Sequence, residues 1–322
     1  MSENNKRYIS SLYSHIDETF RLSNSKMADI IEGFIANGTL KGLQFDDTVF
    51  PMKGPNTVLK TGIIYLQDGF LSYLWTVCYF MIGLTEIYQD MAATGKPIVN
   101  LMESEKFQIL NNTFAWGRSL KMGLADEFGE WPDHIANPLD ETVRSNQANH
   151  LLVLAATYLM FHEMGHLVQH RDAAEYINRV KSPYYDQTDE DRRRLRMMEI
   201  QADNYAVDAM FKSITDEHDR YLRFLATIIA HLSEFFLRHI PNTKAINYPD
   251  LDERLKRVIK KIDVQHPGYK MHLDLTLTIG LQTFFALTFA EYIPSEMKDF
   301  AFEDFDELSD YLFRLIDAWK EK

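Results

Sequence analysis

Long apolar runs dominate the hydrophobic pattern of this 322-residue chain. Residues 149–168 are apolar nearly all round, which predicts a buried helix that begins at residue 140 or 145 and ends at residue 170. Two further runs, residues 69–84 and 275–290, contain no charged side chain. A membrane-spanning helix needs about 20 apolar residues. Both runs are therefore expected to be core helices, with peripheral membrane association left open.

The patterns along the rest of the chain predict further helices. An amphipathic helical start covers residues 1–36, and apolar runs predict a helix or helix pair over 61–92 and a helix over 216–240. Other helices are expected over residues 103–122, 188–211, 250–262 and 305–319. Thr188 and Asp191 predict a capping box where one of these helices starts. Glycines and prolines between residues 37 and 58 favour short strands at 39–45 and 48–52, and a substrate-binding strand is expected within 39–52. The fold class is thus mainly α with a small β element, with the apolar helix buried at the centre.

No internal repeat, low-complexity tract or long linker divides the chain. We therefore expect a single domain over residues 1–322, with a division into an N-terminal helical part, 1–138, and a catalytic part, 139–322, as the alternative. Glycine and proline, with 14 and 10 residues, are scarce, as in helix-rich proteins.

The net charge of −13 argues against nucleic acid as a primary ligand, because no excess of cations exists to neutralise phosphates. The single cysteine, Cys78, excludes an intrachain disulfide. The first residues lack the apolar stretch of a signal peptide. A cytoplasmic protein is therefore expected.

The central apolar run contains His162-Glu163-Met164-Gly165-His166, which fits the zinc-protease pattern H-E-x-x-H. Residues four apart share one face of a helix, so His162 and His166 can bind one Zn²⁺ ion at about 2.0–2.1 Å. Glu163 is then expected to take a proton from water at the metal. Two core histidines satisfied by other partners are the alternative, but metal binding would satisfy all three buried polar groups. His170 is expected to end the helix, where a cation meets the dipole favourably.

A catalytic zinc needs a third protein ligand. The metzincin extension of the motif is absent, because Gln169 and Asp172 stand where that pattern has glycine and histidine. Glu199 and Asp203 are four residues apart on the next strong helix. Glu199 could reach the metal there, while Asp203 accepts the outer N–H of a ligand histidine. A solvated acidic pair is the alternative, since arginines at 192–196 come just before.

The order H-E-x-x-H, then E-x-x-x-D, resembles the gluzincin metalloproteases, whose third ligand is a glutamate on a downstream helix. Related gluzincins carry H-P-x-x-x-x-R-[IL] after that helix. Here Tyr248-Pro249 begins a similar pattern that ends at Arg254-Leu255, with tyrosine in place of histidine. The resemblance implies that Tyr248 stabilises the oxyanion, for which its hydroxyl is suited, and that Arg254 braces the site. Alternatively, Pro249-Asp250 simply opens a helix.

A mainly helical, cysteine-poor chain of this size, with H-E-x-G-H about half way along, also resembles the Lit-like phage-exclusion peptidases. That resemblance implies a cytoplasmic bacterial zinc metalloprotease that acts in phage defence. It would cleave a translation factor once a phage peptide or protein activates it. Two other functions stay open: a metalloprotease-fold regulator or sensor that cleaves little, and a helical interaction protein with a structural zinc.

Overall fold

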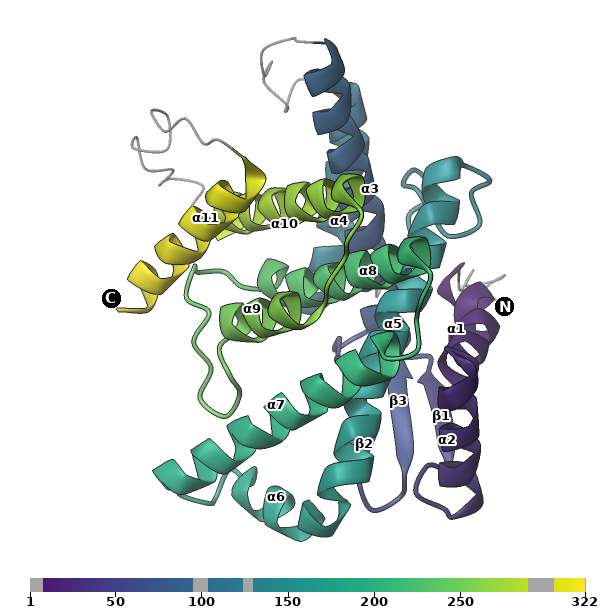
Figure 1. Ribbon diagram of the computed structural model, residues 1–322, viewed down its shortest axis with the longest axis vertical. Coiled ribbons are helices and arrows are strands. Elements are labelled where there is room, and N and C mark those ends of the chain that lie inside the picture. Colours follow the sequence, from purple (N-terminus) through teal and green to yellow (C-terminus); the bar gives the residue numbers. More distant parts are fainter. Residues whose placement is uncertain (1–7, 95–103, 124–129, 289–303, 322) are drawn as a thin grey trace.

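The protein is described by a computed structural model over residues 8–94, 104–123, 130–288 and 304–321. It is mainly helical with one small sheet, which confirms the predicted fold class (Figure 1). The helices are two short 3-10 segments, Tyr8–Leu12 and Arg171–Ala173, and α1 (Tyr13–Arg21), α2 (Ser25–Ala36), α3 (Asp68–Thr94), α4 (Glu105–Met122), α5 (Val143–His170), α6 (Ala174–Val180), α7 (Asp189–Phe211), α8 (Glu217–Phe236), α9 (Leu251–Lys261), α10 (Pro267–Thr288) and α11 (Phe305–Lys320).

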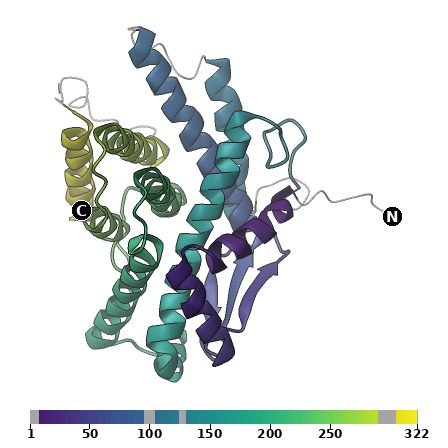
Figure 2. The ribbon, with the colours of Figure 1, turned by 45° about the vertical axis from the view of Figure 1, so that its right-hand side comes forward.

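Helix α5 is the central element, with other helices and the sheet arranged around it (Figure 2). It packs against α1, α3, α7 and α8. Leu152, Ala156 and Phe161 are completely buried, and burial of one large apolar side chain stabilises a fold by about 1.5–3 kcal/mol. The Thr142 hydroxyl caps the start of the helix by accepting a 3.0 Å hydrogen bond from the Ser145 amide. The predicted central buried helix is confirmed.

The small sheet has the strand order β1-β3-β2 and lies beside α1 and α2 (Figure 2). Strand β1 (Gly42–Asp46) pairs in parallel with β3 (Ile63–Gln67), and β2 (Asn56–Val58) pairs antiparallel with β3. Strand β1 overlaps the first predicted strand, 39–45. The second predicted strand, 48–52, is wrong. Its Pro51 has no amide hydrogen to donate to a sheet, and the chain is a bend there.

The prediction of a helix from residue 61 is also wrong at its start, because Ile63–Gln67 forms β3 and α3 begins at Asp68. Ile64 and Leu66 are completely buried, whereas Ile63 and Tyr65 are half-buried. This alternation is the period of a strand. The alternating segment is short and is followed directly by the apolar helix α3, so the sequence pattern alone does not separate the strand from the helix.

Two segments, Asp68–Met91 and Val143–Val180, are long and apolar enough to cross a membrane by length and composition. Their most apolar windows are 89% and 78% buried inside the protein. Packing within the fold thus accounts for the apolar character of these helices. The run at 275–290 lies in α10 as far as Thr288, and residues 289 and 290 are outside the described residues.

The last helix, α11, packs beside α10 and reaches the start of α9 (Figure 1). The ammonium group of Lys320 lies 3.0 Å from Asp252 and 3.4 Å from Asp250. Asp252 is fully buried and also accepts a 2.6 Å hydrogen bond from the Thr243 hydroxyl. A buried carboxylate is stable only with such partners. The C-terminal helix therefore fixes the first turn of α9.

Candidate metal centre and active-site cleft

Helix α7 crosses α5 at the H-E-x-x-H motif (Figure 1). A Cβ atom added at Gly165 would lie 3.0 Å from the Ala202 Cα atom and 3.1 Å from the Tyr205 Cβ atom. Glycine and alanine thus allow the two helix backbones to approach closely. Thr188 and Asp191 form the predicted capping box that starts α7. Glu199, one turn before Ala202, is carried to the motif by this crossing.

Three side chains converge at the crossing. The His162 and His166 Nε2 atoms lie 3.2 Å apart, and the Glu199 Oε2 atom lies 3.3 Å and 3.5 Å from them, respectively. Ligands about 2.0–2.1 Å from a tetrahedral zinc are separated by about 3.3–3.4 Å, so this triangle has the right size. Two imidazole nitrogens and one carboxylate oxygen are also a donor set found in catalytic zinc sites. The three residues therefore fit a zinc ion.

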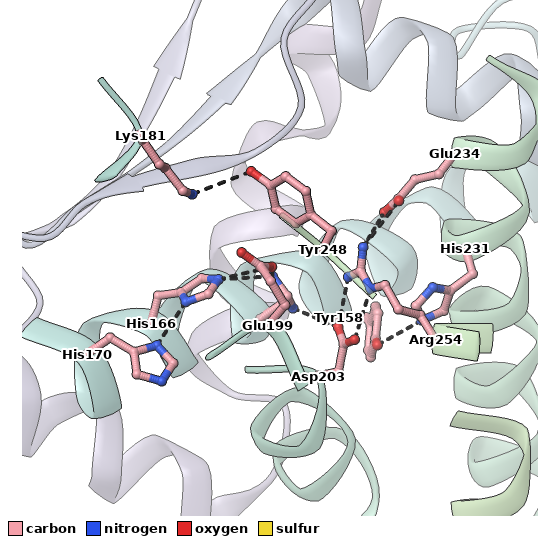
Figure 3. Close-up of polar contacts among 11 residues, drawn as sticks. Tyr158, His166, His170, Lys181, Glu199, Asp203, His231, Glu234, Tyr248 and Arg254 are labelled. Atoms are coloured by element: carbon pink, nitrogen blue, oxygen red, sulfur yellow. Dashed lines mark hydrogen bonds and ion pairs between the residues drawn. The ribbon is translucent and has the colours of Figure 1, made fainter. Parts of the chain in front are cut away.

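Asp203 and Arg254 lie directly behind the triangle (Figure 3). Asp203 accepts a 2.8 Å hydrogen bond from His162 Nδ1, and the Arg254 guanidinium donates to both Asp203 oxygens at 2.9 Å and 2.8 Å. Arg254 also lies 3.2 Å from Glu234. Burial raises the pKa of Asp203, but Arg254 and His162 outweigh it and hold that pKa well below the usual range. Removing one partner of such a buried pair typically costs about 3–5 kcal/mol.

A second buried pair lies behind Arg254, where the Tyr158 hydroxyl is 2.9 Å from His231 Nε2 (Figure 3). Burial lowers the pKa of His231 to about 3, so its imidazole is neutral near pH 7. The pair does not line the cleft. It is a hydrogen-bonded support between α5 and α8.

The pKa values of the two glutamates at the site are shifted in opposite directions. Burial raises the pKa of Glu163 to about 7, which suits a group that accepts and returns a proton at neutral pH. Burial also raises the pKa of Glu199, but hydrogen bonds from His162 and His166 outweigh it and lower that pKa. Burial lowers the pKa of His162, whereas Asp203 and Glu199 raise it to about 10. The cluster thus favours positive charge between the histidines and Glu199.

A cleft of about 630 Å³ opens over the triangle and is lined by His162, Glu163, His166 and Glu199. Strand β2 forms part of its wall. Of the segment 39–52, where a substrate-binding strand was predicted, Met52 lines the cleft.

Tyr248 also lines the cleft and is 40% exposed. Its hydroxyl lies 3.4 Å from the Lys181 ammonium (Figure 3). Arg254 lines the same cleft, next to Asp203. The structure therefore brings all seven predicted site residues to one region of the molecule.

His170 and Gln201 extend this site and were not predicted from the sequence. His166 Nδ1 lies 3.0 Å from His170 Nδ1 (Figure 3). His170 Nε2 lies 2.9 Å from Gln201 Oε1. Burial lowers the pKa of both imidazoles, so both are neutral near pH 7. The Gln201 oxygen can only accept, so His170 donates from Nε2 and accepts at Nδ1 from His166. The His166 Nε2 lone pair therefore faces the triangle. In the sequence, the spacing of His162, His166 and His170, four residues apart each time, was the signal that could have pointed to a role of His170 in the site.

We expect Gln201→Met to weaken zinc binding about 10- to 100-fold, as loss of an outer partner of a ligand histidine typically does. Methionine cannot accept the His170 Nε2 hydrogen, so the chain that fixes the His166 ring is broken. Gln201→Glu keeps an acceptor and should retain most of the affinity. Competition with a chelating dye measures the dissociation constant, with exposed Gln169→Met as the control. Equal affinity in Gln201→Met and wild type would contradict this role.

Comparison with known families gives one match, a family model described as peptidase U49 over residues 64–273. This range begins in β3, ends in α10, and includes the triangle, Asp203, Tyr248 and Arg254. Searches of curated proteins and of solved structures find no match. A peptidase family implies a hydrolase, and the matched range covers well over half of the chain. The chain therefore belongs to the peptidase U49 family.

Proposed function

We propose that this protein is a zinc-dependent endopeptidase of the gluzincin type. The observation that carries the proposal is the triangle of His162, His166 and Glu199 at a cleft large enough for a peptide, in a chain that belongs to a peptidase family. A zinc ion held there would supply Lewis-acid chemistry, polarising the scissile carbonyl and making water more acidic.

The residues of the chain have distinct roles in this proposal. Glu163, in the cleft and with its pKa raised to about 7 by burial, takes a proton from the attacking water and passes it to the leaving amine. Tyr248, at the exposed rim, donates a hydrogen bond to the oxyanion. Asp203, held by Arg254, fixes the ring of His162. The edge strand β2 offers backbone groups to an extended peptide.

A catalytic site is favoured over a structural zinc by the composition of the cluster. Within the described part of the chain, no fourth histidine, cysteine or carboxylate joins the triangle. Structural sites have four protein ligands, whereas catalytic sites keep one position open. All three residues of the triangle line the cleft, so an open fourth position would be accessible from it.

The finer identity that we propose follows the resemblance to Lit-like phage-exclusion peptidases. In this proposal the protein is cytoplasmic and cleaves one intracellular protein, with a translation factor as the candidate substrate. A phage peptide or protein activates it, because an unregulated protease would damage its own cell. A metalloprotease-fold regulator is the alternative, and a cleavage product that forms only with the activator separates the two.

Metal removal tests the proposal. We expect about one zinc per purified chain by mass spectrometry, because the described residues hold one such triangle. Incubation with extracts of phage-infected cells should produce new protein N-termini. A chelator should abolish these N-termini, and added zinc should restore them. Wild-type protein that is purified without chelators and contains no zinc would refute the proposal.

A further inference from the structure

Four basic side chains line the cleft, and each comes from a different part of the fold. They are Lys60, Lys121, Lys181 and Arg238, here called the basic rim. Lys60 follows β2, Lys121 lies in the last turn of α4, Lys181 follows α6, and Arg238 follows α8. The rim is positive although the whole chain carries a net charge of −13.

The charges of the basic rim are largely free for a ligand. Among the described residues, no carboxylate lies within 4.0 Å of Lys121, Lys181 or Arg238. Lys60 lies 3.8 Å from Glu175, but both side chains are exposed. Exposed ion pairs contribute little free energy, so Lys60 can exchange this partner for a ligand. Lys181 donates a hydrogen bond to the hydroxyl of Tyr248.

The acidic groups of the cleft offset the rim little, because each one either has a basic partner or is only partly exposed. Glu199 lies against His162 and His166. Glu234 lies against Arg254. Glu163 is half-buried. The open part of the cleft therefore presents cations that lack acidic partners.

We propose that this cleft selects peptide segments that carry aspartate or glutamate near the scissile bond, and that the basic rim recognises those carboxylates. This inference rests on the proposed function and names its substrate class. Charges placed around a cleft mainly determine which partner binds and how fast it arrives, and they reject partners of like charge. The rim residues line the cleft from four separate segments of the chain, so a peptide bound in the cleft would meet cations from more than one segment.

Binding to full-length, zinc-loaded Glu163→Gln tests the inference without turnover. The probes are three fluorescent peptides of one length with a shared neutral centre and flanks of Asp/Glu, Asn/Gln or Lys. We expect the acidic peptide to bind about tenfold more tightly than the amide peptide, a difference of about 1.4 kcal/mol. Adding Lys181→Gln and Arg238→Gln should remove this preference. Adding Lys26→Gln and Lys270→Gln, which remove the same charge outside the cleft, should not.

Charge reversal gives a second readout. With Lys181→Glu and Arg238→Glu in the same background, the lysine peptide should bind more tightly than the acidic peptide. Raising the salt concentration should narrow both preferences, because exposed charges are screened. Equal binding of the acidic and amide peptides, or no binding of any peptide, would overturn the inference. Displacement of the acidic peptide by a single-stranded oligonucleotide of lower dissociation constant would also overturn it in favour of a nucleic-acid groove.

The inference and the proposed function fail in separate ways. Binding preferences of Glu163→Gln report recognition, whereas zinc content and chelator-sensitive cleavage by wild type report chemistry. Zinc-dependent cleavage with no preference for acidic peptides refutes the basic rim alone. A preference for acidic peptides in a wild-type chain without zinc refutes the enzyme and leaves an acidic-peptide binding site.

Discussion

Replacing Glu163 with glutamine is expected to abolish peptide hydrolysis while the chain keeps its zinc. The amide has nearly the same shape but cannot accept a proton from water, and loss of general acid–base catalysis lowers a rate about 10²- to 10⁴-fold. Glu163 is outside the triangle of His162, His166 and Glu199, so the donor set is unchanged. The effect should therefore appear in the cleavage rate and not in the zinc content.

The measurement compares cleavage rate and zinc content of Glu163→Gln and wild type under identical activating conditions. Glu253→Gln, on the exposed side of α9, loses the same charge away from the cleft and should cleave at the wild-type rate. In a phage infection assay, cells that express Glu163→Gln should lose any protection that wild type gives. A normal cleavage rate in Glu163→Gln would remove Glu163 from the mechanism.

Glu199→Ala is expected to lose zinc at concentrations where wild type holds it. The variant removes one of the three proposed ligands, so the loss should exceed the roughly 10- to 100-fold change that follows loss of an outer partner. It also leaves His162 and His166 without the carboxylate that lies 3.3 Å and 3.5 Å from their Nε2 atoms. Zinc content and the dissociation constant, by dye competition, measure the effect.

The fold should survive this substitution, because buried apolar residues lie on both α5 and α7. Met164 of α5 and Ala202 and Ala206 of α7 are completely buried. Circular dichroism and thermal unfolding check this expectation. Glu190→Ala, on the exposed first turn of α7, is the matched control and should keep its zinc. Full zinc occupancy in Glu199→Ala would rule out Glu199 as a ligand, and global unfolding would point to a structural metal.

The central part of this architecture follows from local sequence patterns. The helical period alone predicts that His162 and His166 share a face, because residues four apart on any helix do. The position of Glu199 depends on which helix crosses α5 and how closely. Gly165 and Ala202 determine that distance, and their importance becomes visible only when the two helices are seen together.

Other features could not be predicted because they depend on long-range contacts or on ambiguous local signals. Strand β3 is a short apolar segment, and a short apolar segment does not distinguish a strand from a buried helix. His170 was assigned to a helix end, but its partner Gln201 comes from α7. The basic rim joins four cations that are far apart in the sequence, so no local pattern contains it.

The contact of α11 with α9 has a practical consequence for purification. Lys320 neutralises Asp252 in the turn that also carries Arg254, and Arg254 holds the Asp203 carboxylate behind the triangle of His162, His166 and Glu199. A polyhistidine tag joined directly after this helix would bring extra metal-binding and charged groups close to Lys320. The zinc content measured for such a fusion would include zinc bound to the tag as well as zinc bound to the triangle. A weakened Lys320 contact would also disturb the support of the triangle. A cleavable tag, removed before metal analysis, avoids both effects.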